Sequence, residues 1–194
     1  MTLRKRHIRA ILVAVHLTGA MLVGGWPALA QDPEFDPELT GEEAADGTTP
    51  LPGRGSVTNM PLPRFVSLKG SEGNARRGPS LSHRIDWVFR HRDMPLMVTA
   101  EFGHWRRVED RDGQGGWIHY SLLSGVRTAM ITVDLAELRA SPRLDAGVVA
   151  KAENGAIVRL EDCGIDWCRV SAEGERGWLP KTEIWGVGKD EIRE

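Results

Sequence analysis

The sequence predicts an all-β protein made of two small barrels in tandem. A motif of a Trp, a basic residue, a Val, a polar turn and a Gly-Trp pair occurs twice, starting at Trp105 and at Trp167. Short apolar runs alternate with turn residues around both motifs, and no long segment has helical periodicity. Each repeat has roughly 60 residues, which is near the lower size limit of a domain that folds alone. We therefore expect domains at 64–126 and 127–188.

Residues 1–30 have the pattern of a secretory signal peptide. A basic start precedes an apolar run at 8–23, and Ala28-Leu29-Ala30 fits a small-x-small cleavage site. The alternative is an uncleaved membrane anchor, but the apolar run is short for a membrane span and contains polar residues. We expect cleavage after Ala30 and a periplasmic or secreted protein that has no other contact with the membrane.

Residues 31–63 are expected to form a disordered acidic linker. The segment is rich in Pro, Gly, Asp, Glu and Thr, and residues 31–53 carry seven acidic and no basic side chains. Such a composition buries too little apolar surface to offset the entropy lost on ordering. The alternative is an acidic arm that docks on a basic partner.

The first unit is predicted to consist of short strands at 64–68, 85–89, 95–102, 105–110, 116–120 and 126–133. Residues 70–79 and 111–115 have turn composition, and residues 121–123 are expected to form one helical turn. Strand alternation places Leu96, Val98 and Ala100 on one face of the third strand.

Alternation also separates the Trp residues from the core. Trp105 and Val108 point to opposite faces of their strand, and Trp117 and Ile118 divide in the same way. Val108 is the better core residue, so Trp105 is expected on the outer face or at the mouth of the barrel. The alternative is that these Trp residues cover a barrel end or the junction between the two units.

The second unit contains both cysteines of the chain. With the Trp motifs aligned, Cys163 falls on Glu101 and Cys168 on Arg106, so each copy has an attractive cross-strand pair at one position. Export makes a Cys163–Cys168 disulfide the expected state. The alternatives are a zinc site, which would need further ligands, and a redox pair, which usually has two residues between its cysteines.

These motifs resemble the bacterial SH3 (SH3-like) domain family. Residues 74–80, NARRGPS, are similar to the N-x-R-x-G-P-S turn of that family. Residues 105–108 and 116–118 resemble its W-x-[KR]-V and G-W-[IV] strands, which recur at 167–170 and 177–179. The second turn departs from the pattern, because Glu137 and Ser141 replace its Asn and its Gly. The whole chain is similar to exported tandem SH3-like proteins of Gram-negative bacteria.

The resemblance implies small barrels of five to seven strands with a non-catalytic targeting role, often beside cell-wall peptidases and amidases. The implied ligand is a peptidoglycan peptide or an envelope protein, and the alternative is a structural scaffold or assembly subunit without a small ligand. The first copy keeps the turn motif, so it is the expected binding unit. Its expected binding residues are Arg76, Arg77, Trp105, Arg107, Trp117 and Tyr120, since Trp and Arg are frequent at binding hot spots.

Other classes of function lack support in the sequence. Residues 64–126 carry ten basic and seven acidic side chains and residues 127–194 ten and thirteen, which is not the basic excess of a nucleic-acid-binding protein. No Gly-rich phosphate loop, G-x-S-x-G nucleophile motif or metal-ligand spacing of histidines is present. We therefore expect no enzyme activity, no cofactor and no bound metal.

Overall fold

The computed structural model describes residues 52–194, and the secondary structure of these residues is almost entirely β. Two single-turn 3-10 helices, η2 (Tyr120–Leu122) and η3 (Lys181–Glu183), interrupt the strands. In the part of the chain described, no helix is both long enough and apolar enough to span a bilayer. The predicted signal peptide, its cleavage site and residues 31–51 of the predicted linker lie outside the described residues.

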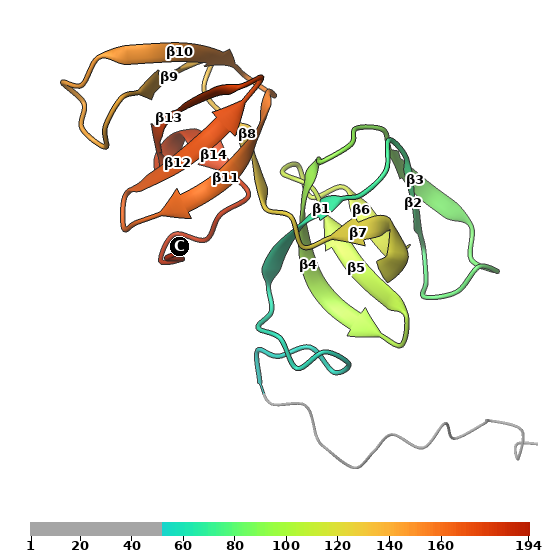
Figure 1. Cartoon of the computed structure of the whole chain (residues 1–194). Helices are drawn as coiled ribbons and strands as arrows, with labels where there is room; N and C mark the ends of the chain where they lie inside the picture. Colours follow the sequence, from blue (N-terminus) through green and yellow to red (C-terminus); the bar gives the residue numbers. More distant parts are fainter. Residues whose placement is uncertain (1–51) are drawn as a thin grey trace, which may run out of the picture. The chain divides into compact units, whose positions relative to one another are not determined.

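The strands form two separate antiparallel sheets, which confirms the prediction of two tandem all-β units (Figure 1). The first sheet has the order β3-β2-β6-β5-β4-β1-β7 and the second the order β10-β9-β13-β12-β11-β8-β14, so the two units repeat one topology. The first sheet comprises β1 (Arg64–Leu68), β2 (Gly73–Arg76), β3 (Ile85–Phe89), β4 (Pro95–Phe102), β5 (Trp105–Glu109), β6 (Gly115–His119) and β7 (Leu123–Ser124).

The second sheet comprises β8 (Thr128–Ile131), β9 (Leu135–Arg139), β10 (Val148–Glu153), β11 (Ile157–Cys163), β12 (Trp167–Ala172), β13 (Glu175–Pro180) and β14 (Ile184–Trp185). We keep 64–126 and 127–188 as the proposed domain limits. The strand predicted at 126–133 to close the first unit is wrong, because β8 lies in the second sheet and pairs with β11. The short β7 completes the first sheet beside β1.

Each barrel has its own apolar core. The first is built from Leu68, Ala75, Phe89, Leu96, Val98, Val108 and Ile118. The second is built from Ala129, Ile131, Ala136, Leu138, Val158, Leu160, Cys163, Cys168, Val170, Leu179 and Ile184. Val108 and Ile118 are fully buried, as strand alternation predicted.

Strand β2 was not predicted, because residues 70–79 have the composition of a turn. Ala75 of this strand is fully buried and pairs with Trp87 of β3. The equivalent residue of the second barrel, Leu138, is larger, and its partner in β10, Ala150, is smaller than Trp87.

A β-bulge in β4 changes which residues of this strand face the core, so the prediction for Ala100 is wrong. Val98 pairs with Val108 but Ala100 pairs with Arg107, so the register shifts between the two pairs. Leu96 and Val98 are fully buried as expected, whereas the bulge turns Ala100 away from the core and brings Glu101 inward. The second barrel has a register shift at the same place, between Leu160 and Cys163.

Residues 52–63 also differ from the expectation of a disordered linker. A bridge between Arg54 and Pro61 closes a hairpin, and the amides of Val57 and Thr58 donate hydrogen bonds to the carboxylate of Glu101 at 3.0 and 2.8 Å. The composition predicts disorder because these residues bury little apolar surface by themselves. A buried acceptor on a distant strand supplies the ordering contacts instead.

Candidate functional site

Three of the predicted binding residues form one row across the first sheet. Arg107 of β5 pairs with Trp117 of β6, and Trp117 pairs with Arg76 of β2. Paired residues of antiparallel strands point to the same side, so a guanidinium group lies on each side of the indole. Val108 and Ile118, the next residues along the two strands, point into the core.

Gly116, the glycine of the Gly-Trp motif, allows strands β2 and β6 to approach each other at this row. A Cβ atom at this position would lie 2.6 Å from the carbonyl oxygen of Arg76, and the φ of Gly116 is 151°. Both the close approach and this backbone conformation favour glycine. The glycine of the Gly-Trp motif therefore has a structural role that does not depend on a ligand.

The row lies in a groove of about 300 Å³. Its lining combines three arginines with two acidic residues, one Trp and backbone of the 113–116 turn, as follows: Arg76, Arg77, Asp86, Arg107, Glu109, Gly113, Gly115, Gly116 and Trp117. Four of the six predicted residues, Arg76, Arg77, Arg107 and Trp117, therefore meet in this groove. Asp86 and Glu109 also line the groove and were not among the residues predicted from the sequence.

The arginines on the β2 side of the groove are held by the protein itself. Arg76 donates to the carbonyl oxygens of Leu81 and His83 at 3.1 and 2.6 Å and thereby fixes the turn before β3. Arg77 donates to Asp86 at 3.0 Å. This hydrogen bond from Arg77, supported by Arg84, keeps the pKa of Asp86 below its usual value. The guanidinium of Arg76 is thus occupied by carbonyl groups of the protein, and its role is to shape the groove.

Of the three arginines that line the groove, Arg107 has the weakest internal pairing. Its Nη2 lies 3.7 Å from a carboxylate oxygen of Glu109, and its side chain is 56% exposed. An exposed pair at this distance contributes little, so the guanidinium can exchange Glu109 for a carboxylate of a ligand.

Trp105 and Tyr120 lie in a cluster of aromatic rings that continues from the row. Trp105 pairs with His119 across β5 and β6, and their rings meet edge to face at 5.6 Å. Tyr120 lies against His119 at 4.9 Å and against His104 at 5.6 Å, and it is 50% exposed. The two histidines of this cluster were not expected there, although alternation along β6 places His119 on the face of Trp117.

The cysteines form the predicted disulfide. Cys163 and Cys168 face each other across β11 and β12, with their Cα atoms 4.1 Å apart. In the first barrel Glu101 and Arg106 occupy the equivalent positions, with the Arg106 Nε 3.5 Å from the Glu101 carboxylate. Among residues 52–194, no group of three His, Cys, Asp or Glu side chains has the arrangement of a metal site.

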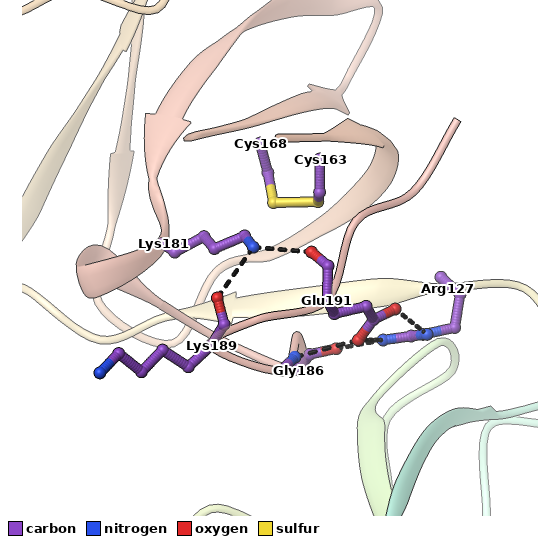
Figure 2. Close-up of a disulfide and its surroundings, with 8 residues drawn as sticks. Arg127, Cys163, Cys168, Lys181, Gly186, Lys189 and Glu191 are labelled. Atoms are coloured by element: carbon purple, nitrogen blue, oxygen red, sulfur yellow. Dashed lines mark hydrogen bonds and ion pairs between the residues drawn. A yellow bond between two sulfur atoms is a disulfide. The ribbon is translucent and has the colours of Figure 1, made fainter. Parts of the chain in front are cut away.

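A C-terminal tail closes the second barrel beside the disulfide. Arg193 exchanges two backbone hydrogen bonds with Cys163, at 2.7 and 2.9 Å. Lys181 donates to the carbonyl oxygens of Lys189 and Glu191, and Arg127 donates to both oxygens of the Glu191 carboxylate (Figure 2). Burial alone would raise the pKa of Glu191, but hydrogen bonds from Arg127 and from the amide of Gly188, with the charges of Arg127 and Arg193, together lower it.

The second barrel has a groove at the position of the Arg–Trp–Arg row, but its charges are neutralised. Trp178 and Arg169 line a volume of about 290 Å³. The Nε atom of Arg169 lies 2.9 Å from Glu161, which also pairs with Arg176 at 3.2 Å. Ala140 stands in the place of Arg77. This groove therefore has no weakly paired guanidinium comparable with Arg107.

Comparison with known proteins identifies a family for most of the described chain. The family model described as "Bacterial SH3 domain" matches residues 69–125 and again 132–186. No curated protein matches the chain.

Two solved structures from Trichomonas vaginalis are among those similar to the chain. The structure of NlpC2 has 14% sequence identity and a TM-score of 0.31, and the match covers 63% of this chain and 48% of that one. The structure of NlpC1 has 15% identity and a TM-score of 0.30, and the match covers 63% and 45%. The matches thus span about half the length of each of these proteins.

Proposed function

The chain belongs to the bacterial SH3 domain family, and we propose that it is an exported binding module whose first barrel recognises a peptidoglycan peptide or an envelope protein. Domains of this family are binding modules, and the proposal adds a location and a ligand class. The observation that carries it is the row of Arg76, Trp117 and Arg107 in one groove of the first barrel.

The chemistry of the groove fits an extended peptide that carries carboxylates. The exposed guanidinium of Arg107 can form two parallel hydrogen bonds with a carboxylate. The indole of Trp117 offers a flat apolar surface beside it, and Asp86 and Glu109 offer acceptors to amide or amino groups. A ligand with backbone amides and a free carboxylate would satisfy all of these groups together.

The expected result of a sedimentation assay with purified peptidoglycan sacculi is binding that depends on the first groove. Arg107→Ala should weaken the apparent affinity for sacculi about tenfold, because a carboxylate held by a charged hydrogen bond loses its partner. Arg169→Ala changes the equivalent residue of the second barrel and serves as the matched control, so it should pellet like the unchanged protein.

Two results would contradict the proposal for the cell wall. Equal pelleting of the unchanged protein, Arg107→Ala and Arg169→Ala would remove the groove from the interaction. If no protein pellets, the same three proteins are tested for capture of envelope proteins, and capture that ignores Arg107 would end the proposal for the first barrel.

A further inference from the structure

The second barrel contains a larger cavity that is separate from both grooves. Its volume is about 670 Å³. It lies between the turn that joins β9 to β10, the hairpin that joins β11 to β12, and helix η3. The lining residues that matter for binding are Leu144, Ile165, Asp166, Trp167, Glu183 and Lys189.

The same place in the first barrel is occupied by the aromatic cluster. Trp105 and Trp167 are equivalent, and their cross-strand partners are His119 and Pro180. The ring of His119, which packs against Trp105, and the ring of Tyr120, which packs against His119, are replaced by Pro180 and Lys181 in the second barrel. The rings that fill this place in one copy are thus absent from the other, and the face of Trp167 is left in an open cavity.

Lys181 does not fill the cavity in place of these rings. Its ammonium group is bound by the carbonyl oxygens of Lys189 and Glu191, at 3.1 and 2.7 Å (Figure 2). Two aliphatic side chains instead extend from the cavity walls into solvent, since Leu144 is 73% and Ile165 is 75% exposed. Both residues line the cavity, so they offer apolar surface at its rim.

The charges that remain free at this cavity are mainly acidic. Arg143 is paired with Asp145 at 3.4 Å. Within residues 52–194, neither Asp166 nor Glu183 takes part in an ion pair. Lys189 is the remaining basic residue of the lining, because Arg143 is bound to Asp145 and Lys181 to backbone carbonyl groups. Two unpaired carboxylates that line one cavity with an indole favour a positively charged group.

We propose that this cavity is a second binding site, for a peptide segment in which a Lys or Arg side chain follows an aliphatic residue. The aliphatic residue would pack between Leu144 and Ile165, and the stem of the basic side chain would lie across Trp167. The ammonium or guanidinium group would then reach Asp166 and Glu183. The site differs in chemistry from the groove of the first barrel and does not depend on the function proposed for that groove.

The test uses two short peptides that differ only in the charged group. The ¹⁵N-labelled protein is titrated with Ac-Leu-Lys-NH₂ and with Ac-Leu-norleucine-NH₂, whose last side chain is a neutral alkyl chain. The indole N–H of Trp167 and the amide of Ile165 should shift, while the indoles of Trp105 and Trp117 should not. The lysine peptide should bind about fivefold more tightly than the norleucine peptide, given two partly exposed charge contacts.

The double substitution Asp166→Asn and Glu183→Gln should remove the preference for lysine and leave weak binding of both peptides. The control is Glu153→Gln with Glu175→Gln, which changes the net charge equally at exposed positions outside the cavity and should keep the preference. Equal affinity of the unchanged protein for the two peptides would overturn the proposal. So would shifts confined to the first barrel, or no shift at the highest peptide concentration.

Discussion

At the scale of single residues, Glu101 is the most strongly perturbed group of the first barrel. Burial would raise the pKa of Glu101, but hydrogen bonds from the hydroxyl and amide of Thr58, from Arg64 and from the amide of Val57 lower it to about 2. The carboxylate therefore joins the N-terminal hairpin to β1 and β4.

The pH dependence of the stabilisation by Glu101 follows from the lowering of its pKa. The pKa in the folded state lies below the ordinary glutamate value of 4.5, so the stabilisation is complete above that value and is lost as the pH falls towards 2. Glu101→Gln should therefore lower the free energy of unfolding by about 2 kcal/mol at neutral pH, and the difference from the unchanged protein should shrink below pH ~4.5. Urea unfolding at several pH values measures it.

Glu72→Gln is the matched control, because Glu72 is an exposed acid of the same barrel. This variant should unfold like the unchanged protein throughout. A difference between the unchanged protein and Glu101→Gln that stays constant from neutral to acidic pH would show that the carboxylate is not held as described.

At the scale of elements, different extensions of the chain pack against the equivalent ends of β4 and β11 in the two barrels. The N-terminal hairpin covers Glu101 at the end of β4, and the C-terminal tail pairs with Cys163 at the end of β11. Arg64 and Arg127 occupy equivalent positions, one bound to Glu101 and the other to Glu191 of the tail. In the second barrel Cys163 stands at the strand position of Glu101, and the C-terminal tail supplies Glu191 as the acid that binds the arginine.

The disulfide is expected to stabilise the second barrel to a limited degree. The two cysteines are five positions apart, so the loop that they close is short and its loss should lower the free energy of unfolding by about 2 kcal/mol. Urea unfolding of Cys163→Ser with Cys168→Ser, compared with the unchanged protein, measures this difference.

Reductant provides the control for this comparison. It should destabilise the unchanged protein to the level of the double variant and should leave the double variant unaffected. If reduction does not alter the unfolding of the unchanged protein, the bridge contributes nothing beyond the tail contacts and the packing around it.

At the scale of the whole molecule, two separate cores support two repeats of one sheet. Ile118 and Leu179 are equivalent and both fully buried, each within its own cluster. The repeats have diverged at their surfaces, where the first keeps a weakly paired Arg107 and the second keeps the open cavity beside Trp167. One scaffold can thus present two chemically different surfaces.

Separate cores predict that a core substitution acts mainly within its own barrel. Ile118→Ala and Leu179→Ala should each lower stability by about 2–5 kcal/mol. Amide hydrogen exchange should show lost protection in the first barrel for Ile118→Ala and in the second for Leu179→Ala. Equal loss of protection in both barrels, from either substitution, would contradict two independent cores.

The sequence by itself determined the repeat, the all-β class, the burial of Val108 and Ile118 and the pairing of the cysteines. These follow from local rules, because strand alternation and the spacing across a hairpin decide which residues face each other. The meeting of Arg107 and Trp117 was also predictable, since both belong to motifs on neighbouring predicted strands, whereas Arg76 joins them through β2, which the turn composition hides.

Only the tertiary structure decided the rest. The bulge that brings Glu101 and Cys163 inward depends on pairing between strands, and the order of residues 52–63 depends on a carboxylate about 40 positions away. The cavity beside Trp167 arises because a ring stack is replaced by Pro180 and by a lysine that the tail binds. Contacts between residues far apart in the chain leave no periodic signal in the sequence, so folding had to bring them together before they could be recognised.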